Sequence, residues 1–306
     1  MKQWFIILMV GIMAILAACG DNSADQVQSE EQSEEEQVAE ENEKDNDETE
    51  SDKSNSDDES ETEEQSNESE QESESTNEES TKEDNAEVDK DEEKETLYEM
   101  NNVWAFDPID DAPSDVVLLT IDDGPDGHML DMAKTLNDLG AKAIFFVNGI
   151  FMNDDESRAI VKQIHDMGFA IGNHTYGHEN LSNLSAAEQR DQIVSLNELI
   201  EDVTGEKPNF FRAPHGINTD VARQVVQEEG MLLMNWSYGY DFKQDYMEKD
   251  AIADIMVNTE LLSDGANLLM HDREWTNAAL EDIVTGLRDK GYDMLDPDTI
   301  SLPTDE

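Results

Sequence analysis

Residues 21–95 contain almost no side chains from which a hydrophobic core could be built. This segment has 35 Asp and Glu residues against 5 Lys, and most of the remainder is Ser, Asn, Gln and Thr. Such a composition buries too little apolar surface to offset the entropy lost on ordering. We therefore predict a disordered, self-repelling acidic linker at 20–95 and one folded domain at 96–306.

The first 19 residues carry a different signal. An apolar stretch from Trp4 to Leu16 leads into Leu16-Ala17-Ala18-Cys19-Gly20, which resembles a bacterial lipoprotein lipobox. The resemblance implies cleavage before Cys19, lipid attachment there, and a location on the outer face of the cytoplasmic membrane with reach into the cell wall. A transmembrane anchor is the alternative, although the stretch is marginal in length for a span. Cys19 is the only cysteine, so the domain folds without disulfides.

Seven apolar runs, beginning near residues 116, 143, 169, 209, 231, 266 and 292, alternate with helical patterns in the domain. Glycines such as Gly140 and Gly230 stand between a helical pattern and the next run, where they tolerate the left-handed conformation that ends a helix. Ser185 and Glu188 form a capping-box signature for a helix through Ile200. This alternation predicts an α/β fold, a closed or nearly closed parallel barrel, with an open doubly wound sheet as the alternative.

Candidate functional residues follow several of these runs. Asp122 and Asp123 come directly after Val116-Val117-Leu118-Leu119, and adjacent like charges need a cation or a proton to offset one of them. His174 and His178 follow the run at 169, and two imidazoles with one carboxylate suit a divalent transition metal. An acidic surface turn and two surface histidines are the bland alternatives. The chain has only six His, however, and His271 ends a further run.

Taken in order, these motifs resemble the polysaccharide deacetylase (NodB-homology, carbohydrate esterase) family over roughly residues 115 to 300. The resemblance implies a distorted seven-stranded barrel and a metal, usually zinc and in some members cobalt or manganese. It implies metal binding by Asp123, His174 and His178, with Asp122 as general base and His271 as general acid. It further implies that Arg212 positions the base and that Asp241 orients or tunes His271.

The chain departs from the family pattern at two places. The usual Asp-Trp motif is Asp241-Phe242 here, with Trp236 earlier, so either aromatic ring is a candidate wall of the substrate pocket. His215 follows the Arg-x-Pro motif, where the family commonly has an aromatic residue or Gly, and it is either a substrate contact or a loop residue. The candidate substrate-binding residues are Trp236, Phe242, Leu269 and Pro214.

These residue types suit hydrolysis of an N-acetyl amide, which needs an activated water, stabilisation of an oxyanion and a proton for the amine. The resemblance implies a deacetylase of peptidoglycan or a chitin-like glycan, with N-acetylglucosamine or N-acetylmuramic acid as the sugar. Two alternatives are an amidohydrolase of a small nitrogen compound and an inactive wall-binding lipoprotein, which should have lost one of the site residues. Residues 96–306 carry 41 acidic and 13 basic residues. This balance argues against nucleic acid as a partner and fits high-salt or alkaline surroundings.

Overall fold

The computed structural model describes residues 95–303. The predicted signal segment with Cys19, and the predicted linker apart from Glu95, lie outside the described residues. Within residues 95–303, no helix combines the length and the hydrophobicity that a membrane crossing requires.

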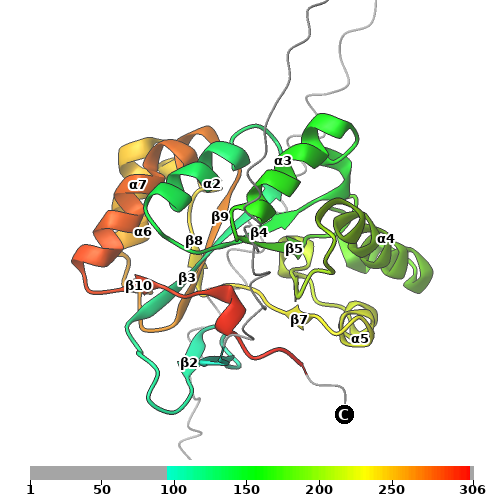
Figure 1. Ribbon diagram of the computed structural model, residues 1–306, viewed down its shortest axis with the longest axis horizontal. Helices are drawn as coiled ribbons and strands as arrows, with labels where there is room; N and C mark the ends of the chain where they lie inside the picture. Colours follow the sequence, from blue (N-terminus) through cyan, green and yellow to red (C-terminus); the bar gives the residue numbers. More distant parts are fainter. Residues whose placement is uncertain (1–94, 304–306) are drawn as a thin grey trace, which may run out of the picture.

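One parallel sheet forms the centre of the domain (Figure 1). Its strands are hydrogen-bonded in the order β7-β6-β5-β4-β3-β9-β8, and β10 pairs with the beginning of β3. The bounds are β3 (Val116–Gly124), β4 (Ile144–Val147), β5 (Ala170–Asn173), β6 (Phe210–Phe211), β7 (Leu232–Leu233), β8 (Tyr238–Gly239), β9 (Ala266–His271) and β10 (Asp293–Met294). All seven predicted strands are present, and the two-residue β8 is an addition.

The ends of this strand order must lie near each other. Strands β7 and β8 are its two edges, yet only residues 234–237 connect them. A flat sheet of seven strands would separate its edges by about 29 Å. Four connecting residues span at most about 18 Å. The sheet therefore curls into a barrel left open between β7 and β8, among the described strands, which confirms the barrel over the open doubly wound sheet.

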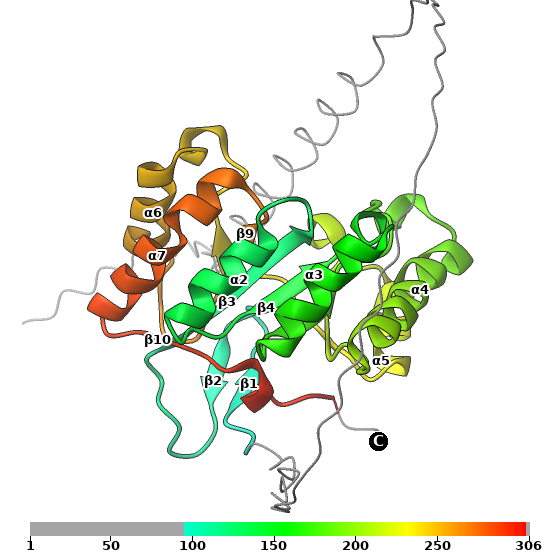
Figure 2. The ribbon, with the colours of Figure 1, turned by 45° about the horizontal axis from the view of Figure 1, so that its top comes forward.

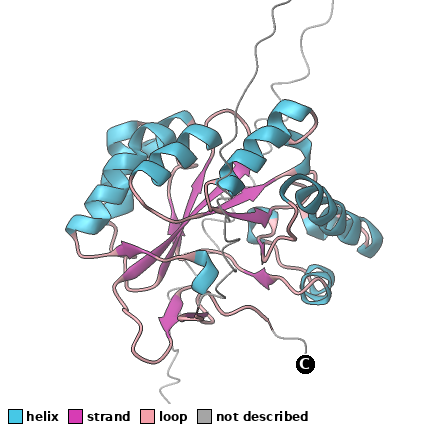
Figure 3. Ribbon diagram, viewed as in Figure 1, coloured by secondary structure: helices cyan, strands magenta, loops and turns pink. Residues whose placement is uncertain are grey.

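The α-helices of residues 95–303, six in number, form a belt around the outside of the sheet (Figures 2 and 3). Each contacts the next in the order α6-α7-α2-α3-α4-α5. Buried side chains of α6, α7, α2, α3 and α4 share one core cluster with Val117, Leu119 and Ile121 of β3, whereas those of α5 lie in a second cluster with Phe211 of β6. The helices are α2 (Met129–Asp138), α3 (Asp155–Asp166), α4 (Ala186–Thr204), α5 (Asp220–Glu228), α6 (Lys249–Asn258) and α7 (Glu274–Asp289). The capping box predicted at Ser185 and Glu188 is confirmed at the start of α4.

The amino ends of the strands are closed by an apolar plug, which we define as Tyr98, Phe106, Leu118, Leu295 and Ile300. Tyr98 and Phe106 come from the antiparallel hairpin of β1 (Tyr98–Met100) and β2 (Phe106–Pro108). The backbone of Phe106 donates to the carbonyl of Gly265 over 2.8 Å, and a Cβ on that glycine would lie 1.9 Å from the carbonyl oxygen of Phe106. Only glycine allows this approach.

Short 3-10 turns complete the described chain. They are η1 (Gly149–Phe151), η2 (Leu181–Asn183), η3 (Pro214–Gly216), η4 (Gln244–Tyr246) and η5 (Pro297–Thr299). Two of them lie at the carboxyl ends of strands, where η1 follows β4 and η3 follows β6. Because all the barrel strands are parallel, the segments that follow them gather at one end of the barrel, and the candidate site lies there.

Candidate active site

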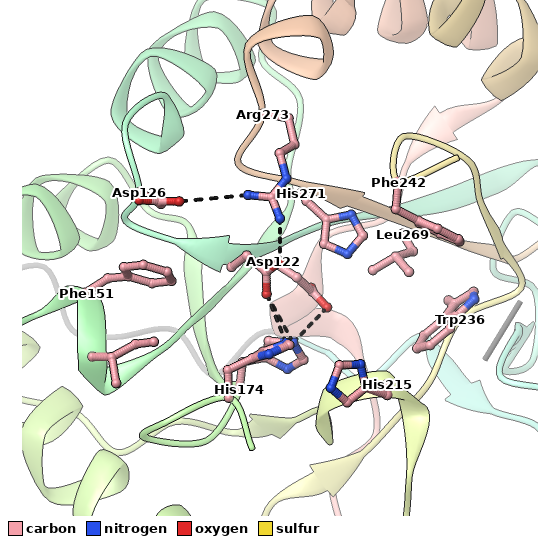
Figure 4. A pocket seen from close by; sticks show the side chains of 13 residues that line it. Asp122, Asp126, Phe151, His174, His215, Trp236, Phe242, Leu269, His271 and Arg273 are labelled. Carbon is pink, nitrogen blue, oxygen red and sulfur yellow. Dashed lines mark hydrogen bonds and ion pairs between the residues drawn. The ribbon is translucent and has the colours of Figure 1, made fainter. Parts of the chain in front are cut away.

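A cavity of about 280 Å³ opens at the carboxyl ends of the strands (Figure 4). The five candidate ligand, base and acid residues all line it: Asp122, Asp123, His174, His178 and His271. The structure thus brings together side chains from β3, β9 and the segment after β5, which are up to 149 positions apart in the sequence. Of the other candidates, His215, Trp236, Phe242 and Leu269 also line the cavity.

Asp122 and Asp123 both reach this cavity because β3 is irregular at its end. Successive side chains of a regular strand point to opposite faces of the sheet. The pairing of β3 with β4 shifts register between Ile121 and Gly124, and Asp123 has a φ of 65°, in the left-handed region. The irregularity turns the second carboxylate to the same side as the first. Asp122 itself stays in register opposite His271 of β9.

Asp123, His174 and His178 present a set of atoms suited to a metal ion. Asp123 Oδ1 lies 3.6 Å from His174 Nε2 and 3.3 Å from His178 Nε2, and one ligand atom from each residue lies within 4.8 Å of the others. Asp123 Oδ1 is buried and accepts no hydrogen bond from any described residue. A buried acceptor without a donor is costly, and a cation in this position would remove the cost.

The two imidazoles are in the form that binds metals. Burial lowers the pKa of His174 and of His178 to about 4, against the opposing pull of Asp123, so both rings are neutral at physiological pH. His174 Nδ1 lies 2.8 Å from the carbonyl of Arg212, which can only accept, so Nδ1 carries the proton and Nε2 keeps its lone pair. For Asp123, burial would raise the pKa, but the surrounding His178, His271, His174 and Arg273 outweigh it and hold the pKa low.

The segment that carries the two histidines is held by amide side chains that the sequence did not reveal as site residues. Asn148, fully buried after β4, donates to the carbonyls of His174 and Thr175 over 2.6 and 3.2 Å. Gln192 of α4 accepts from the backbone of Gly177 over 2.6 Å. Thr175 and His178 have positive φ values of 69° and 54°. These contacts stabilise a backbone shape that the residues alone disfavour.

Asp122 is a buried carboxylate paired with a buried guanidinium. Arg212, with no exposed surface, donates to Asp122 Oδ1 over 2.7 Å and also to Thr120, Asn235 and Asn267. Burial raises the pKa of Asp122 to about 6, although Arg212 acts in the opposite direction. Asp122 Oδ2 lies 3.6 Å from His174 Nε2, on the side of the metal candidates. The pair gives a carboxylate with one oxygen fixed and a basicity suited to accepting a proton near neutral pH.

His271 is held and charged by Asp241. His271 Nδ1 and its backbone N–H each donate to one oxygen of Asp241 over 2.6 Å, and Thr276 donates to the second oxygen over 2.8 Å. Burial alone would lower the pKa of His271, but Asp241 in direct contact, with Asp123 and Asp122 nearby, raises it to about 10. The imidazole is therefore protonated at neutral pH and is able to act as an acid.

The candidate substrate contacts divide into two groups. Trp236, Phe242 and Leu269 form an apolar wall of the cavity, and the Phe242 ring meets the His271 ring edge-on with centroids 5.8 Å apart. His215 has a φ of 56°, and its ring lies 5.0 Å from that of His178. Pro214 is buried at the start of η3 and is not among the residues that line the cavity.

Four further residues line the cavity that sequence reasoning did not select: Asp126, Ile150, Phe151 and Arg273. Arg273 Nη2 donates to Asp123 Oδ2 over 3.0 Å, and Nη1 lies 3.8 Å from Asp126 Oδ2. Their closeness in sequence to the candidate residues could have identified two of them, because Asp126 follows the paired aspartates by three residues and Arg273 follows His271 by two. Asp272, which lies between His271 and Arg273 in the sequence, fixes the loop after β3 by accepting hydrogen bonds from the backbone N–H groups of Asp126 and His128.

Residues 110–234 match the family model described as polysaccharide deacetylase. The chain is 33% identical over 187 residues to a peptidoglycan-N-acetylglucosamine deacetylase of Bacillus cereus, with 57% of this chain and 64% of the relative covered. It is 29% identical over 181 residues to the peptidoglycan-N-acetylmuramic acid deacetylase PdaA of Bacillus subtilis, covering 58% of this chain and 67% of the relative. The chain thus spans less than two thirds of the Bacillus cereus relative.

Solved structures give the same picture. A family 4 carbohydrate esterase of Streptomyces lividans, in complex with acetate, has a TM-score of 0.54 and 28% identity, over 60% of this chain and 93% of that one. A CE4 family pseudoenzyme of Bacillus anthracis has a TM-score of 0.54 and 30% identity, over 59% of this chain and 63% of that one. Together with the curled parallel barrel and the motifs that converge on its cavity, these likenesses support a polysaccharide deacetylase (NodB-homology, CE4) domain in this chain.

Proposed function

We propose that the domain hydrolyses N-acetyl groups of a cell-wall polysaccharide, with peptidoglycan N-acetylglucosamine as the substrate and acetate as a product. The observation that carries the proposal is the pairing, in one cavity, of a buried carboxylate with a pKa of about 6 and a buried imidazolium with a pKa of about 10. Groups whose environments push their pKa values apart can act as base and acid in the same cycle. The relatives' names support the glycan substrate.

The residues divide the reaction between them. Asp123, His174 and His178 would hold a divalent cation, zinc in our proposal and cobalt or manganese as alternatives. When bound, such an ion lowers the pKa of water and polarises a carbonyl. Asp122 Oδ2 accepts the proton that water loses as its oxygen bonds to the acetyl carbon. Arg212 keeps Oδ1 occupied, so the base presents one oxygen to the reaction.

His271 completes the reaction on the leaving group. Asp241 occupies Nδ1, which leaves Nε2 as the proton donor to the cavity. As the carbon–nitrogen bond breaks, the nitrogen takes the bonding electron pair and the proton from His271, so the amine departs neutral. The acetyl group leaves as acetic acid, which becomes acetate when it gives its remaining proton to the amine or to solvent. The proton held by Asp122 then returns the imidazole to its charged form, directly or through solvent, and both groups are restored.

A matched set of variants tests this assignment. Asp122→Asn keeps the shape of the side chain but cannot accept a proton, so acetate release from an N-acetylglucosamine oligomer should fall by on the order of 10²–10⁴-fold with metal content unchanged. His271→Ala should lose amide hydrolysis but recover part of its activity on an activated acetyl ester, whose leaving group needs no proton. Asp131→Asn, on the exposed face of α2, is the control for a lost carboxylate.

Two outcomes would replace the proposal. If wild-type protein with full metal content releases no acetate, the chain is an inactive wall-binding protein. The similarity to a CE4 pseudoenzyme is the reason to include this measurement. An N-acetylmuramic acid substrate is the reading if mass spectrometry of treated muropeptides finds the free amine on that sugar, as the name of the PdaA relative allows.

We also propose that Cys19 anchors the protein by a lipid at the outer face of the cytoplasmic membrane. The support is the Leu16-Ala17-Ala18-Cys19 sequence after an apolar segment. Cys19→Ser should abolish labelling by a fatty-acid probe in cells. Persistent labelling would refute the anchor without bearing on catalysis.

A further inference from the structure

Arg273 is a cationic side chain at the mouth of the cavity, and none of the functions above uses it. It stands at the N-cap of α7, two residues after His271, and its guanidinium reaches back over the end of β3 (Figure 4). One nitrogen donates to Asp123 Oδ2 over 3.0 Å, and the other lies 3.8 Å from Asp126 Oδ2. The guanidinium therefore bridges a candidate metal ligand to a carboxylate on the rim.

The two oxygens of Asp123 have different surroundings. Oδ1 faces His174 Nε2 and His178 Nε2 and accepts no hydrogen bond within residues 95–303. Oδ2 accepts from Arg273, which is the one hydrogen-bond donor to this side chain that the described residues supply. A carboxylate can turn about the bond to its Cβ, which would exchange or mix the roles of its oxygens. The contact with Arg273 distinguishes the two oxygens.

We propose that Arg273 is a positioning residue for the metal site, fixing the carboxylate of Asp123 so that Oδ1 alone is presented to the ion. The inference rests on the proposed function, since it assumes that Asp123, His174 and His178 hold a divalent cation. It assigns Arg273 no contact with the reacting atoms. Partners of this kind orient metal ligands, and removing one typically costs about 10–100-fold in metal affinity or activity.

Electrostatic repulsion between Arg273 and the metal ion opposes the gain from orienting Asp123. The balance of the two effects decides whether loss of Arg273 weakens or tightens metal binding. A guanidinium beside a cation site repels the ion, so removing it could tighten binding. The Arg273 side chain is 35% exposed and faces Asp126 as well as Asp123, so solvent and a second carboxylate screen its charge. Asp123 is only 15% exposed, and its hydrogen bond is protected from competing water. Orientation therefore outweighs repulsion, and loss of Arg273 weakens the site.

The experiment compares metal affinity among full-chain variants by competition with a chelator of known affinity, using Zn²⁺ and Co²⁺. Arg273→Met should weaken binding by about 10–100-fold, and Arg273→Lys, which keeps the charge but lacks the planar fork, should fall between it and wild type. Arg190→Met is the matched control, because it removes a positive charge from a surface ion pair with Glu228, and neither residue lines the cavity. This control should bind as the wild type does.

A second readout separates positioning from general loss of structure. The visible absorption of bound Co²⁺ reports the geometry of its ligands, so Arg273→Met at saturating Co²⁺ should shift or weaken these bands while Arg190→Met leaves them unchanged. Equal affinity and an unchanged spectrum in Arg273→Met would overturn the inference, as would tighter binding, which would make Arg273 a competitor of the ion. If wild type and Asp123→Ala bind metal equally, the metal site of the proposed function fails instead.

Discussion

At the amino ends of the strands the barrel interior is filled by Tyr98, Phe106 and Ile300, whereas at the carboxyl ends the same interior carries Asp122 and Arg212. On β3 the change takes four residues, from Leu118 in the plug to Asp122 in the cavity. Both ends are buried to a similar degree, since Leu118 has no exposed surface and Asp122 has 1%. The two regions differ in what burial requires of them.

The plug needs only close packing, because apolar side chains gain free energy on leaving water whatever their partners. The charged end needs specific partners, because an unpaired buried charge costs several kcal/mol. Arg212 donates to two side chains of β3, to a backbone carbonyl after β7 and to a side chain of β9. Asp241 accepts hydrogen bonds from three donors. The difference teaches that stability can be concentrated at one end of the barrel and chemistry at the other.

Removing a metal ligand should have the largest effect, and it should be confined to the charged end. Asp123→Ala, His174→Ala and His178→Ala each delete one atom of the candidate set, so bound metal and acetate release should be lost together. Elemental analysis and an activity assay measure the loss. Thermal unfolding in chelator should stay cooperative because the plug is unaltered. Full metal content in all three variants would show that the site lies elsewhere.

The pH dependence of stability in metal-free protein should show the charge on His271. The folded-state pKa of about 10 lies above the ordinary value of 6.5, so the folded state holds its proton more tightly than the unfolded state. The resulting stabilisation is complete below pH 6.5 and is lost as the pH rises from 6.5 to about 10.

Asp241→Asn isolates this contribution. It removes the carboxylate that raises the pKa of His271, so the melting temperature of chelator-treated variant should depend less on pH between 6.5 and 10 than that of wild type. An NMR titration of the imidazole should show a lower pKa in the variant. Identical pH profiles for the two proteins would contradict the role given to Asp241.

A substitution in the plug should reverse the pattern and change the chemistry least. Phe106 is 2% exposed, and Phe106→Ala should lower the free energy of unfolding by about 3–5 kcal/mol through the cavity that it leaves. Acetate release per folded molecule and metal affinity should stay close to wild type. Val103→Ala, at a position 48% exposed between β1 and β2, should change stability by less than about 0.5 kcal/mol. A large loss of metal affinity in Phe106→Ala would show that the two ends are coupled.

The sequence predicted the parts of this structure that depend on local patterns. Apolar runs indicated β3, β4, β5 and β9, because strands buried on both faces need continuous apolar residues. The barrel followed from their number and from the residues at their ends. Strand β8 escaped prediction because Tyr238 and Gly239 stand among polar and aromatic residues at 235–241, without the apolar run that marked β6 and β7.

Residues that act through tertiary contacts were beyond the reach of these patterns. Asn148 and Gln192 are ordinary polar residues in the sequence, and only the fold brings them to the backbone of the histidine segment. In the sequence, Arg273 is only a charged residue at the start of a helix. The pairing of β9 with β3 is what brings it beside Asp123. The turn of Asp123 into the cavity likewise depends on a register shift against β4 that no local pattern shows.

The place of β3 in the sheet sets the order in which the barrel can be completed. It is the first barrel strand along the chain but a central one in space, and it pairs with β4 nearby, with β9 at Ala266–His271 and with β10 at Asp293–Met294. Native contacts of such large sequence separation slow folding, because the loop must close before they form. A growing chain that has not reached β9 leaves the backbone of β3 unpaired along Val117–Asp122, and such an open strand edge invites aggregation. Assembly of this domain therefore depends on the segment from β9 to β10, and mutations in β9 should affect the yield of soluble protein more than equally buried ones in β5.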